Sequence, residues 1–364
     1  MKNFNILRQC IQKVATGPEY SKDLSLEEAH QAMTAILKDD SDHVQAAVFL
    51  IALRMKRETD AENKGILKAI NDICQVVTAD VEELIDIADP YDGYSRSVPV
   101  SALLPALLAE CGLPAVSHGL EAVGPKYGVT HRMVLRACGV DVDLSPAAAA
   151  KRISDSKVGW AYIDQKSSTP ALHNLVPLRQ RIVKRPVITT VEVLTGPIRA
   201  KSKTHLLTGY VHKAYPPIYA ELARFSNFDS AIIVRGVEGG IVPSLKQEAK
   251  IHSYHNKGTE STVKIEPSEC QIKQDTRAVP IPDDMKKTDP TTDDIVNEYD
   301  VNAVTEYAAE CGKAALSGKA GAAYDSLLYS ASICLKHIGR FSTLGEAATF
   351  VRSVLDSGKA LERL

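Results

Sequence analysis

The residues best placed to bind an anion follow a short apolar run at 84–88, which is typical of a buried strand. A turn-rich loop, Asp89-Pro-Tyr-Asp-Gly93, comes next, and an apolar helix is expected from Ser101 to Cys111. The first amides of a helix lack partners within the helix, and the helix dipole adds partial positive charge there. The stretch therefore predicts a site for an anionic group at this loop.

A second loop of the same kind follows the next predicted strand, at 114–117. His118 and Gly119 begin its turn, and Gly124-Pro-Lys-Tyr-Gly128 leads into another helix. Neighbouring parallel strands end at the same edge of a sheet, so the loops that follow them meet there. The two loops are therefore expected to line one crevice.

Predicted strands and helices alternate through most of the chain. Further strands are expected at 158–163, 186–192, 205–211 and 230–235, and helices at 146–153, 170–182, 216–225, 301–316, 324–338 and 344–357. Residues 245–295 are polar and contain several prolines, which is typical of edge strands and loops. The alternation predicts an α/β fold with a mainly parallel central sheet that is covered on both faces.

The first 80 residues instead predict a small helical domain. Ser25 and Glu28 have the spacing of a capping box, and so do Thr59 and Glu62. The helix expected over 45–55 is almost entirely apolar but too short to cross a membrane. Its apolar surplus, around Val48, Leu50 and Leu53, predicts contact with a second subunit.

Composition limits the class of protein. The chain has 364 residues, of which 45% are hydrophobic and 24% charged, an ordinary globular balance. A formal net charge of -2 gives little support to non-specific nucleic-acid binding, which usually needs a basic excess. The seven cysteines are scattered without a CxxC pair, which favours free thiols in a reducing cytoplasm over a zinc site. No membrane partner is expected, because no apolar run is long enough.

Three segments resemble glycosyltransferase family 3, and within it the anthranilate phosphoribosyltransferases. Ala52-Leu-Arg-Met-Lys-Arg-Glu-Thr59 stands where that family has ALRMKGET, and Leu355-Asp-Ser-Gly-Lys-Ala-Leu-Glu362 resembles AIDSGKALE. The segment 138–146, CGVDVDLSP, is similarly close. The resemblance extends over nearly the whole chain.

This resemblance implies a fold of the nucleoside phosphorylase and phosphoribosyltransferase type. A helical dimerisation domain is expected at 1–80, with 165–185 packing on it, and an α/β domain at 81–364. The implied activity is transfer of phosphoribosyl from phosphoribosyl pyrophosphate to an aromatic amine or related ring, with Mg²⁺ as cofactor. In the family this reaction belongs to tryptophan biosynthesis.

Site residues follow from the resemblance position by position. Those expected to bind the phosphate or phosphoribosyl group are Asp92, Gly93, Ser101, His118, Gly119, Lys126 and Gly128. Arg179 and His118 match residues that face the acceptor, and no catalytic residue is assigned. Four of these residues have a structural alternative: His118 can be a core residue, Lys126 a solvated loop lysine, Arg179 a surface cation or the partner of a nearby carboxylate, and Asp92 a turn residue.

Two departures from the family pattern bear on activity. The family's GTGGDG loop is replaced by 88–93, ADPYDG, which has fewer glycines and an added proline. Ile241-Val-Pro243 occupies the region of the family's acidic metal pair, which leaves Asp92 and Glu238 as candidate ligands for Mg²⁺. Asp89 and Asp92, three residues apart in one loop, are the alternative pair that could hold a single ion. The alternative function is a non-catalytic paralogue that binds a phosphorylated ligand or nucleic acid.

Overall fold

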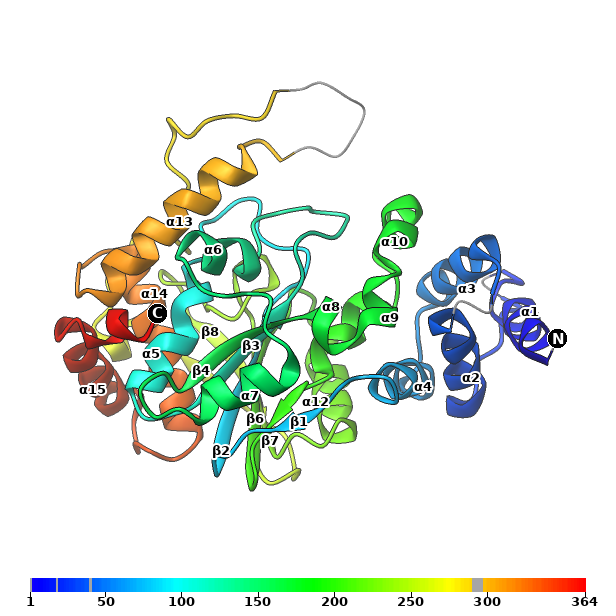
Figure 1. Cartoon of the computed structure of the whole chain (residues 1–364), viewed down its shortest axis with the longest axis horizontal. Helices are drawn as coiled ribbons and strands as arrows, with labels where there is room; N and C mark the ends of the chain where they lie inside the picture. The colour runs from blue at the N-terminus through cyan, green and yellow to red at the C-terminus, as the bar shows by residue number, and fades with distance from the viewer. Residues whose placement is uncertain (1, 18, 39–40, 290–296) are drawn as a thin grey trace.

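The computed structural model describes residues 2–17, 19–38, 41–289 and 297–364, and it gives side chains from Ile6 onward. A helical domain lies at one end of the molecule, and a larger α/β domain makes up the rest (Figure 1). The helical domain contains α1 (Lys2–Val14), α2 (Leu26–Leu37), α3 (His43–Lys56) and α4 (Asp60–Asn71). The predicted fold class, a small helical domain before an α/β domain, is therefore confirmed.

A seven-stranded sheet forms the centre of the α/β domain, in the order β4-β3-β2-β6-β7-β8-β9. Its strands are β2 (Glu83–Ala88), β3 (Ala115–Gly119), β4 (Trp160–Asp164), β6 (Lys203–Gly209), β7 (Ser230–Val234), β8 (Ala249–Tyr254) and β9 (Ser261–Ile265). The first five pair in parallel with one another, whereas β8 pairs antiparallel with both β7 and β9 at one edge. A separate parallel pair joins β1 (Val77–Thr78) to β5 (Ile198–Arg199).

Helices cover both faces of this sheet. The helices of the α/β domain are α5 (Leu104–Glu110), α6 (His131–Ala137), α7 (Pro146–Ser154), α8 (Gln165–Ser168), α9 (Pro170–His173), α10 (Val176–Ile182), α11 (Ile188–Val191), α12 (Tyr215–Phe225), α13 (Val301–Leu316), α14 (Ala322–His337) and α15 (Leu344–Asp356). The 3₁₀ turns are η1 (Val100–Leu103), η2 (Glu192–Leu194), η3 (Val237–Gly239), η4 (Pro267–Cys270) and η5 (Lys359–Arg363).

Side-chain alternation along the strands divides the core in two. Ile232 and Val234 of β7 belong to the hydrophobic cluster that includes α5 and α13 to α15, whereas Ala231 and Ile233 belong to the cluster shared with α12 and the helical domain. Successive strand residues point to opposite faces, so a strand buried on both sides is apolar at every position. This explains why β7 is a continuous apolar run.

Three predicted elements differ from the structure. The predicted strand at 186–192 is wrong, because these residues form α11 and the start of η2. Its β-branched residues favour a strand, but contacts with α4 override that preference. The single helix predicted at 170–182 is divided into α9 and α10, and Pro177 lies in the first turn of α10. The helix expected from Ser101 begins as the 3₁₀ turn η1, just before Pro105.

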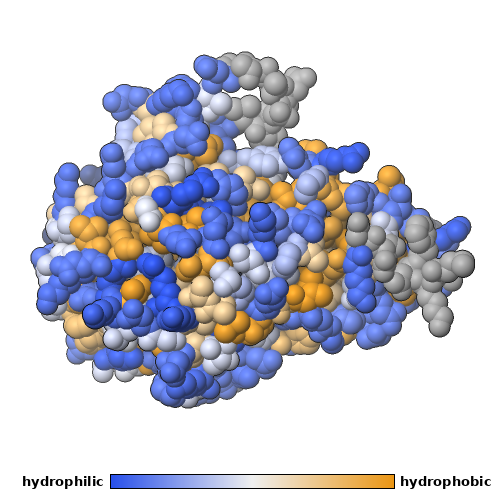
Figure 2. All heavy atoms as spheres, in the orientation of Figure 1, coloured by the Kyte–Doolittle hydropathy of each residue, from blue (hydrophilic) through white to orange (hydrophobic). Residues whose placement is uncertain are grey.

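In the helical domain, α2 and α4 begin as predicted, whereas α3 begins at His43, two residues before the predicted start, and buries a different face from the one expected. Both capping boxes are present, at Ser25 with Glu28 and at Thr59 with Glu62. Leu50 and Leu53 are fully buried inside the chain, which corrects the prediction that they face a second subunit. The exposed apolar residues of α3 are Val44, Val48 and Met55, at 70%, 41% and 79% exposure. Hydrophobic residues also lie on the visible face where the two domains meet (Figure 2).

No described helix is long and apolar enough to cross a membrane.

A group of histidines joins α14 to the strands at the opposite end of the sheet from the predicted crevice. The rings of His255 and His337 stack with centroids 4.1 Å apart, and Ser230 Oγ is hydrogen bonded to His337 Nε2 at 2.8 Å and to His205 Nδ1 at 2.7 Å. Burial, together with the neighbouring imidazoles, lowers the pKa of His337 to about 3. The folded protein therefore resists protonation of this ring.

This lowered pKa predicts acid sensitivity. The unfolded chain protonates His337 below about pH 6.5, whereas the folded chain does not, so stability is complete above that pH and falls as the pH drops toward 3. By pH 5, His337 alone lowers the free energy of unfolding by about 2 kcal/mol. Replacing His337 with Gln should reduce the difference in unfolding free energy between pH 7.5 and pH 5, measured by urea denaturation. The exposed His212→Gln is the control, and an unchanged pH dependence in His337→Gln would contradict the assignment.

Candidate functional site

A cleft of about 810 Å³ lies at the ends of the central strands, next to the helical domain. Most of its lining comes from the loop after β2, the segment 185–193 around α11, and the turns after β6 and β7. Lys126 of the loop after β3, Tyr215 and Tyr219 of α12, residues between 244 and 250, and Arg277 also line it. Arg54 of α3 reaches the cleft from the helical domain. Its guanidinium donates to the hydroxyl of Tyr215, in α12 of the α/β domain, at 2.9 Å. The predicted crevice therefore exists in part: its first predicted loop lines the cleft, only Lys126 of the second loop does so, and both domains contribute residues.

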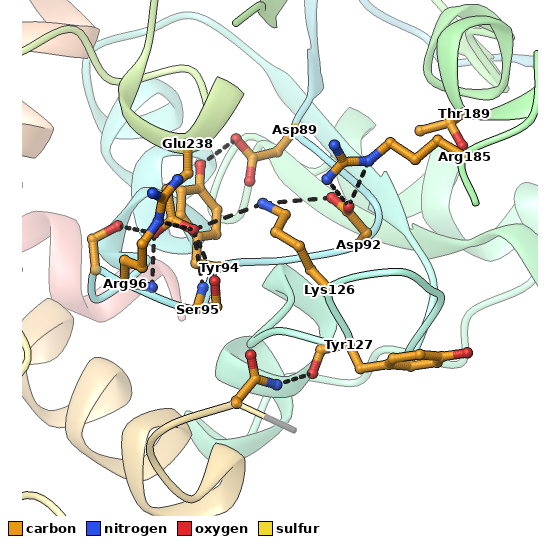
Figure 3. Close-up of polar contacts among 12 residues, drawn as sticks. Asp89, Asp92, Tyr94, Ser95, Arg96, Lys126, Tyr127, Arg185, Thr189 and Glu238 are labelled. Carbon is orange, nitrogen blue, oxygen red and sulfur yellow. Dashed lines mark hydrogen bonds and ion pairs between the residues drawn. The ribbon is translucent and has the colours of Figure 1, made fainter. Parts of the chain in front are cut away.

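Glu238 lies in the turn after β7, and its carboxylate is enclosed by donors from the loop after β2 (Figure 3). The backbone amides of Ser95 and Arg96 donate to it at 3.1 and 2.9 Å. The hydroxyls of Ser95 and Ser97 add hydrogen bonds of 3.3 and 2.8 Å. Its side chain is only 2% exposed, so protein donors replace almost all of the water around this anion.

Lys126 lies between two carboxylates (Figure 3). Its ammonium nitrogen is 3.5 Å from Asp92 Oδ1 and 3.8 Å from Glu238 Oε2. The guanidinium of Arg185 also pairs with Asp92, and its Nε lies 3.1 Å from Oδ2. The structure thus brings together three of the predicted site residues, Asp92, Lys126 and Glu238, and adds Arg185.

The loop glycines hold these groups together by allowing the backbone to approach closely. A Cβ on Gly93 would lie 2.6 Å from backbone atoms of Gly128, and a Cβ on Gly128 would lie 2.3 Å from the carbonyl oxygen of Tyr94. Gly93 also has φ +71°, and its amide donates to the Pro90 carbonyl at 3.1 Å. Gly93 and Gly128, two of the three predicted phosphate-binding glycines, therefore have a packing role.

Ser101 and Asp89 face a buried histidine beneath the cleft. Ser101 Oγ is hydrogen bonded to His131 Nε2 at 2.9 Å, and Asp89 Oδ2 lies 3.0 Å from the same nitrogen. Asp89 Oδ1 accepts from the Tyr94 hydroxyl at 2.8 Å and from the Ile241 amide at 3.2 Å. Asp89 and Asp92 consequently have separate partners, and Ser101 is not part of the cleft lining.

His118 and Gly119 also lie behind the cleft wall. His118 Nε2 is 2.6 Å from Asp86 Oδ1, and its Nδ1 is 2.5 Å from the hydroxyl of Tyr91. Burial raises the pKa of Tyr91 well above its usual value, so this hydroxyl remains protonated. A Cβ on Gly119 would lie 3.2 Å from the Tyr162 hydroxyl, which shows how tightly this layer is packed. Tyr91 lines the cleft, whereas the predicted residues His118 and Gly119 do not.

Arg179, predicted to face the acceptor, makes a buried ion pair instead. Its Nη1 and Nη2 lie 2.7 and 2.6 Å from the two carboxylate oxygens of Glu192, and both side chains are at most 1% exposed. This bidentate pair uses two of the guanidinium's five N–H donors and fixes the orientation of the side chain. The structure does not bring Arg179 into the cleft, and the paired-cation alternative describes its contacts.

Several cleft residues were not found by the sequence interpretation. They are Arg54, Arg96, Arg185, Arg235, Lys250, Arg277, Tyr210, Tyr215 and Tyr219. Arg185 and Arg235 carry one available signal, since Arg185 directly precedes the predicted strand at 186–192 and Arg235 ends the predicted strand at 230–235. The others come from distant segments, and only the tertiary fold brings their side chains together.

Comparison with known proteins agrees with this architecture. A helical-bundle domain model of a glycosyltransferase family matches residues 8–74, and the α/β domain model of that family matches residues 92–279. The second match alone extends over more than half of the chain. The chain belongs to glycosyltransferase family 3.

Similar proteins include anthranilate phosphoribosyltransferases. The enzyme of Thermomicrobium roseum is 25% identical over 97% of this chain and 94% of its own length. An uncharacterised protein of Aquifex aeolicus is 30% identical over 66% of this chain and 71% of its own length. The solved anthranilate phosphoribosyltransferase of Saccharomyces cerevisiae, in complex with PRPP and Mg, has a TM-score of 0.72 at 17% identity, covering 99% of this chain and 96% of that one. At this identity the structural likeness shows the fold.

The residues of this family 3 chain do not fit the Mg²⁺ ion that the resemblance implies. The two candidate ligands, Asp92 and Glu238, have the ammonium of Lys126 between them. Glu238 also accepts four hydrogen bonds, and Asp92 also pairs with the guanidinium of Arg185. Among the described residues, no group of three or more His, Cys, Asp or Glu side chains has an arrangement suited to a metal. The charges that a metal would balance are therefore already balanced by the protein.

Proposed function

We propose that the cleft binds phosphoribosyl pyrophosphate, or another phosphorylated small molecule, through side-chain cations and without Mg²⁺. On this proposal the chain is a phosphoribosyltransferase-like enzyme whose acceptor is an aromatic amine or related ring, as in the anthranilate phosphoribosyltransferases that it resembles. Family membership supports the coarse activity class. The donor, the acceptor and the absence of a metal are the proposal's own additions.

The charge of the lining carries this proposal. Among the described residues that line the cleft, seven are Lys or Arg and three are Asp or Glu. Two of those three, Asp92 and Glu238, are 4% and 2% exposed and already paired. The free surface of the cleft is therefore cationic although the whole chain has a net charge of -2. A concave cationic site concentrates anionic ligands.

The proposed chemistry is displacement of pyrophosphate by an amine. Negative charge grows on the leaving pyrophosphate, so fixed cations near it lower the barrier. Lys126, Arg96 and Arg185 are the candidates for this role. The aromatic side of the cleft suits a ring-shaped acceptor, because Tyr215 and Tyr219 lie there with ring centroids 5.8 Å apart.

A second candidate function is a non-catalytic paralogue that binds a phosphorylated ligand or nucleic acid. The observation that favours it is the internal pairing of Asp92 and Glu238, which removes the acidic groups that a metal-assisted transferase needs. Binding and turnover must therefore be measured separately.

Calorimetric titration with phosphoribosyl pyrophosphate tests the proposed function. Binding should occur in EDTA and should change by less than about threefold when Mg²⁺ is supplied. Replacing Arg185 with Ala should weaken binding at least about tenfold, because a charge-assisted contact is lost and Asp92 is left with one fewer cation.

Lys184→Ala is the matched control, since Lys184 is the exposed neighbour of Arg185 and does not line the cleft. Absence of binding by the unmodified protein in both buffers would refute the proposed function. Binding with no product from anthranilate would favour the second candidate, and tight oligonucleotide binding that weakens steeply with salt would identify nucleic acid as its ligand.

Homodimer formation is part of the same proposal. Val44, Val48 and Met55 lie on the exposed side of α3, where the apolar surface has no partner within the described chain. Burying such side chains against a second copy would remove apolar area from water. Light scattering at micromolar concentration should give the mass of a dimer, and Val48→Asp should give a monomer. Val263→Asp, an equally exposed strand position, is the control, and a monomeric unmodified protein would contradict the proposal.

A further inference from the structure

Glu238 occupies a donor set of the kind that binds phosphoryl oxygens. Consecutive amides at Ser95 and Arg96 and the hydroxyls of Ser95 and Ser97 all point at one carboxylate. Two cations lie just outside this group, with Arg96 Nε at 3.9 Å and Lys126 Nζ at 3.8 Å from Glu238 Oε2. Successive backbone amides and hydroxyls around an anion make a concave oxyanion site. The carboxylate is therefore an internal anion in a site that is not specific for a carboxylate.

The turn that carries Glu238 is suited to release it. Glu238 has φ 56° and ψ 14°, a left-handed conformation that is uncommon for a residue with a side chain. Glycines at 236, 239 and 240 flank it. The far end of the turn is fixed, because the Ile241 amide donates to Asp89. Movement of 237–239 alone would withdraw the carboxylate, relieve the backbone strain and leave the donors in place.

We propose that residues 95–97, with Lys126, form a phosphoryl-binding site that Glu238 keeps closed, and that a phosphoryl group enters by displacing this carboxylate. The inference rests on the proposed function, because it assigns one phosphoryl group of the ligand to this place in the cleft. The inference also makes the site a switch: Glu238 occupies it in the closed state, and a competing anion opens it by displacing Glu238.

Charge decides which ligand can compete. A phosphoryl group carries up to two negative charges and three acceptor oxygens, whereas Glu238 offers one charge and two oxygens. After Glu238 leaves, Lys126 and Arg96 lose one anionic partner and become available to the incoming group. Lys126 remains close to Asp92, so its position is kept during the exchange. The site therefore favours a phosphoryl group over a carboxylate of a ligand.

Inorganic pyrophosphate is the probe for this exchange, with the full-length protein in EDTA. Glu238→Gln removes the competing charge and keeps nearly the same shape, so calorimetry should show pyrophosphate binding at least about tenfold tighter than in the unmodified protein. Glu260→Gln is the matched control. It also removes one ion-paired carboxylate, the partner of Arg224 at 2.6 Å, but lies outside the cleft lining. This control should leave the affinity within about twofold.

Hydrogen exchange on the unmodified protein gives a second readout that does not depend on a variant. In the closed site, Val237 and Gly240 amides are bonded within the turn, to the carbonyls of Val242 and Val237. Pyrophosphate should speed exchange across 236–240 while the amides of Ser95 and Arg96 stay protected by the new anion. A ligand that merely bound beside Glu238 would protect both segments.

Each outcome separates this inference from the proposed function. Equal pyrophosphate affinity in the unmodified protein and in folded Glu238→Gln would overturn the switch and leave ligand binding intact. Protection of both segments on pyrophosphate binding would overturn it in the same way. Absence of pyrophosphate binding in both proteins would overturn the switch, and the titration with phosphoribosyl pyrophosphate would decide the proposed function separately.

Discussion

Two carboxylates buried beside one another are the constraint around which the cleft is built. An ionised carboxylate taken out of water costs several kcal/mol unless partners compensate it. Asp92 and Glu238 meet this requirement together, because Lys126 lies between them and each has further donors of its own. The loops after β2, β3 and β7 are consequently tied to one another by charge, and the glycines at 93 and 128 permit the close approach that this needs.

The same arrangement changes what the fold can do. A transferase that relies on Mg²⁺ keeps acidic oxygens free for the ion, whereas here the corresponding charges are balanced within the chain. What remains exposed to a ligand is a set of cations contributed by both domains. On the proposed switch, binding of a phosphorylated molecule depends on exchange of one internal anion for another, so its affinity is set by how strongly the protein holds Glu238. Family membership fixes the architecture, and these contacts modify its chemistry.

Local patterns in the sequence predicted the architecture well, because capping boxes and apolar strands are determined by near neighbours. They failed at 186–192, where β-branched residues favour a strand but packing on α4 imposes a helix. Asp92, Lys126 and Glu238 were singled out, yet their mutual pairing was not, since it depends on contacts between distant loops. Arg179 and His118 match the family's residue types, but matching alone did not predict their positions. Glu192 binds Arg179 and Asp86 binds His118, and neither side chain reaches the cleft.

The central claim is that protein cations take the place of a metal between Asp92 and Glu238. Titration of the ligand-free protein with Mn²⁺, followed by electron paramagnetic resonance, tests it directly because Mn²⁺ binds the same oxygen ligands as Mg²⁺. The account predicts that the signal of free Mn²⁺ is undiminished at metal concentrations up to about 1 mM, the weak end of the range of specific cation sites. Binding of one Mn²⁺ per chain at micromolar concentration, abolished by Asp92→Asn, would contradict it.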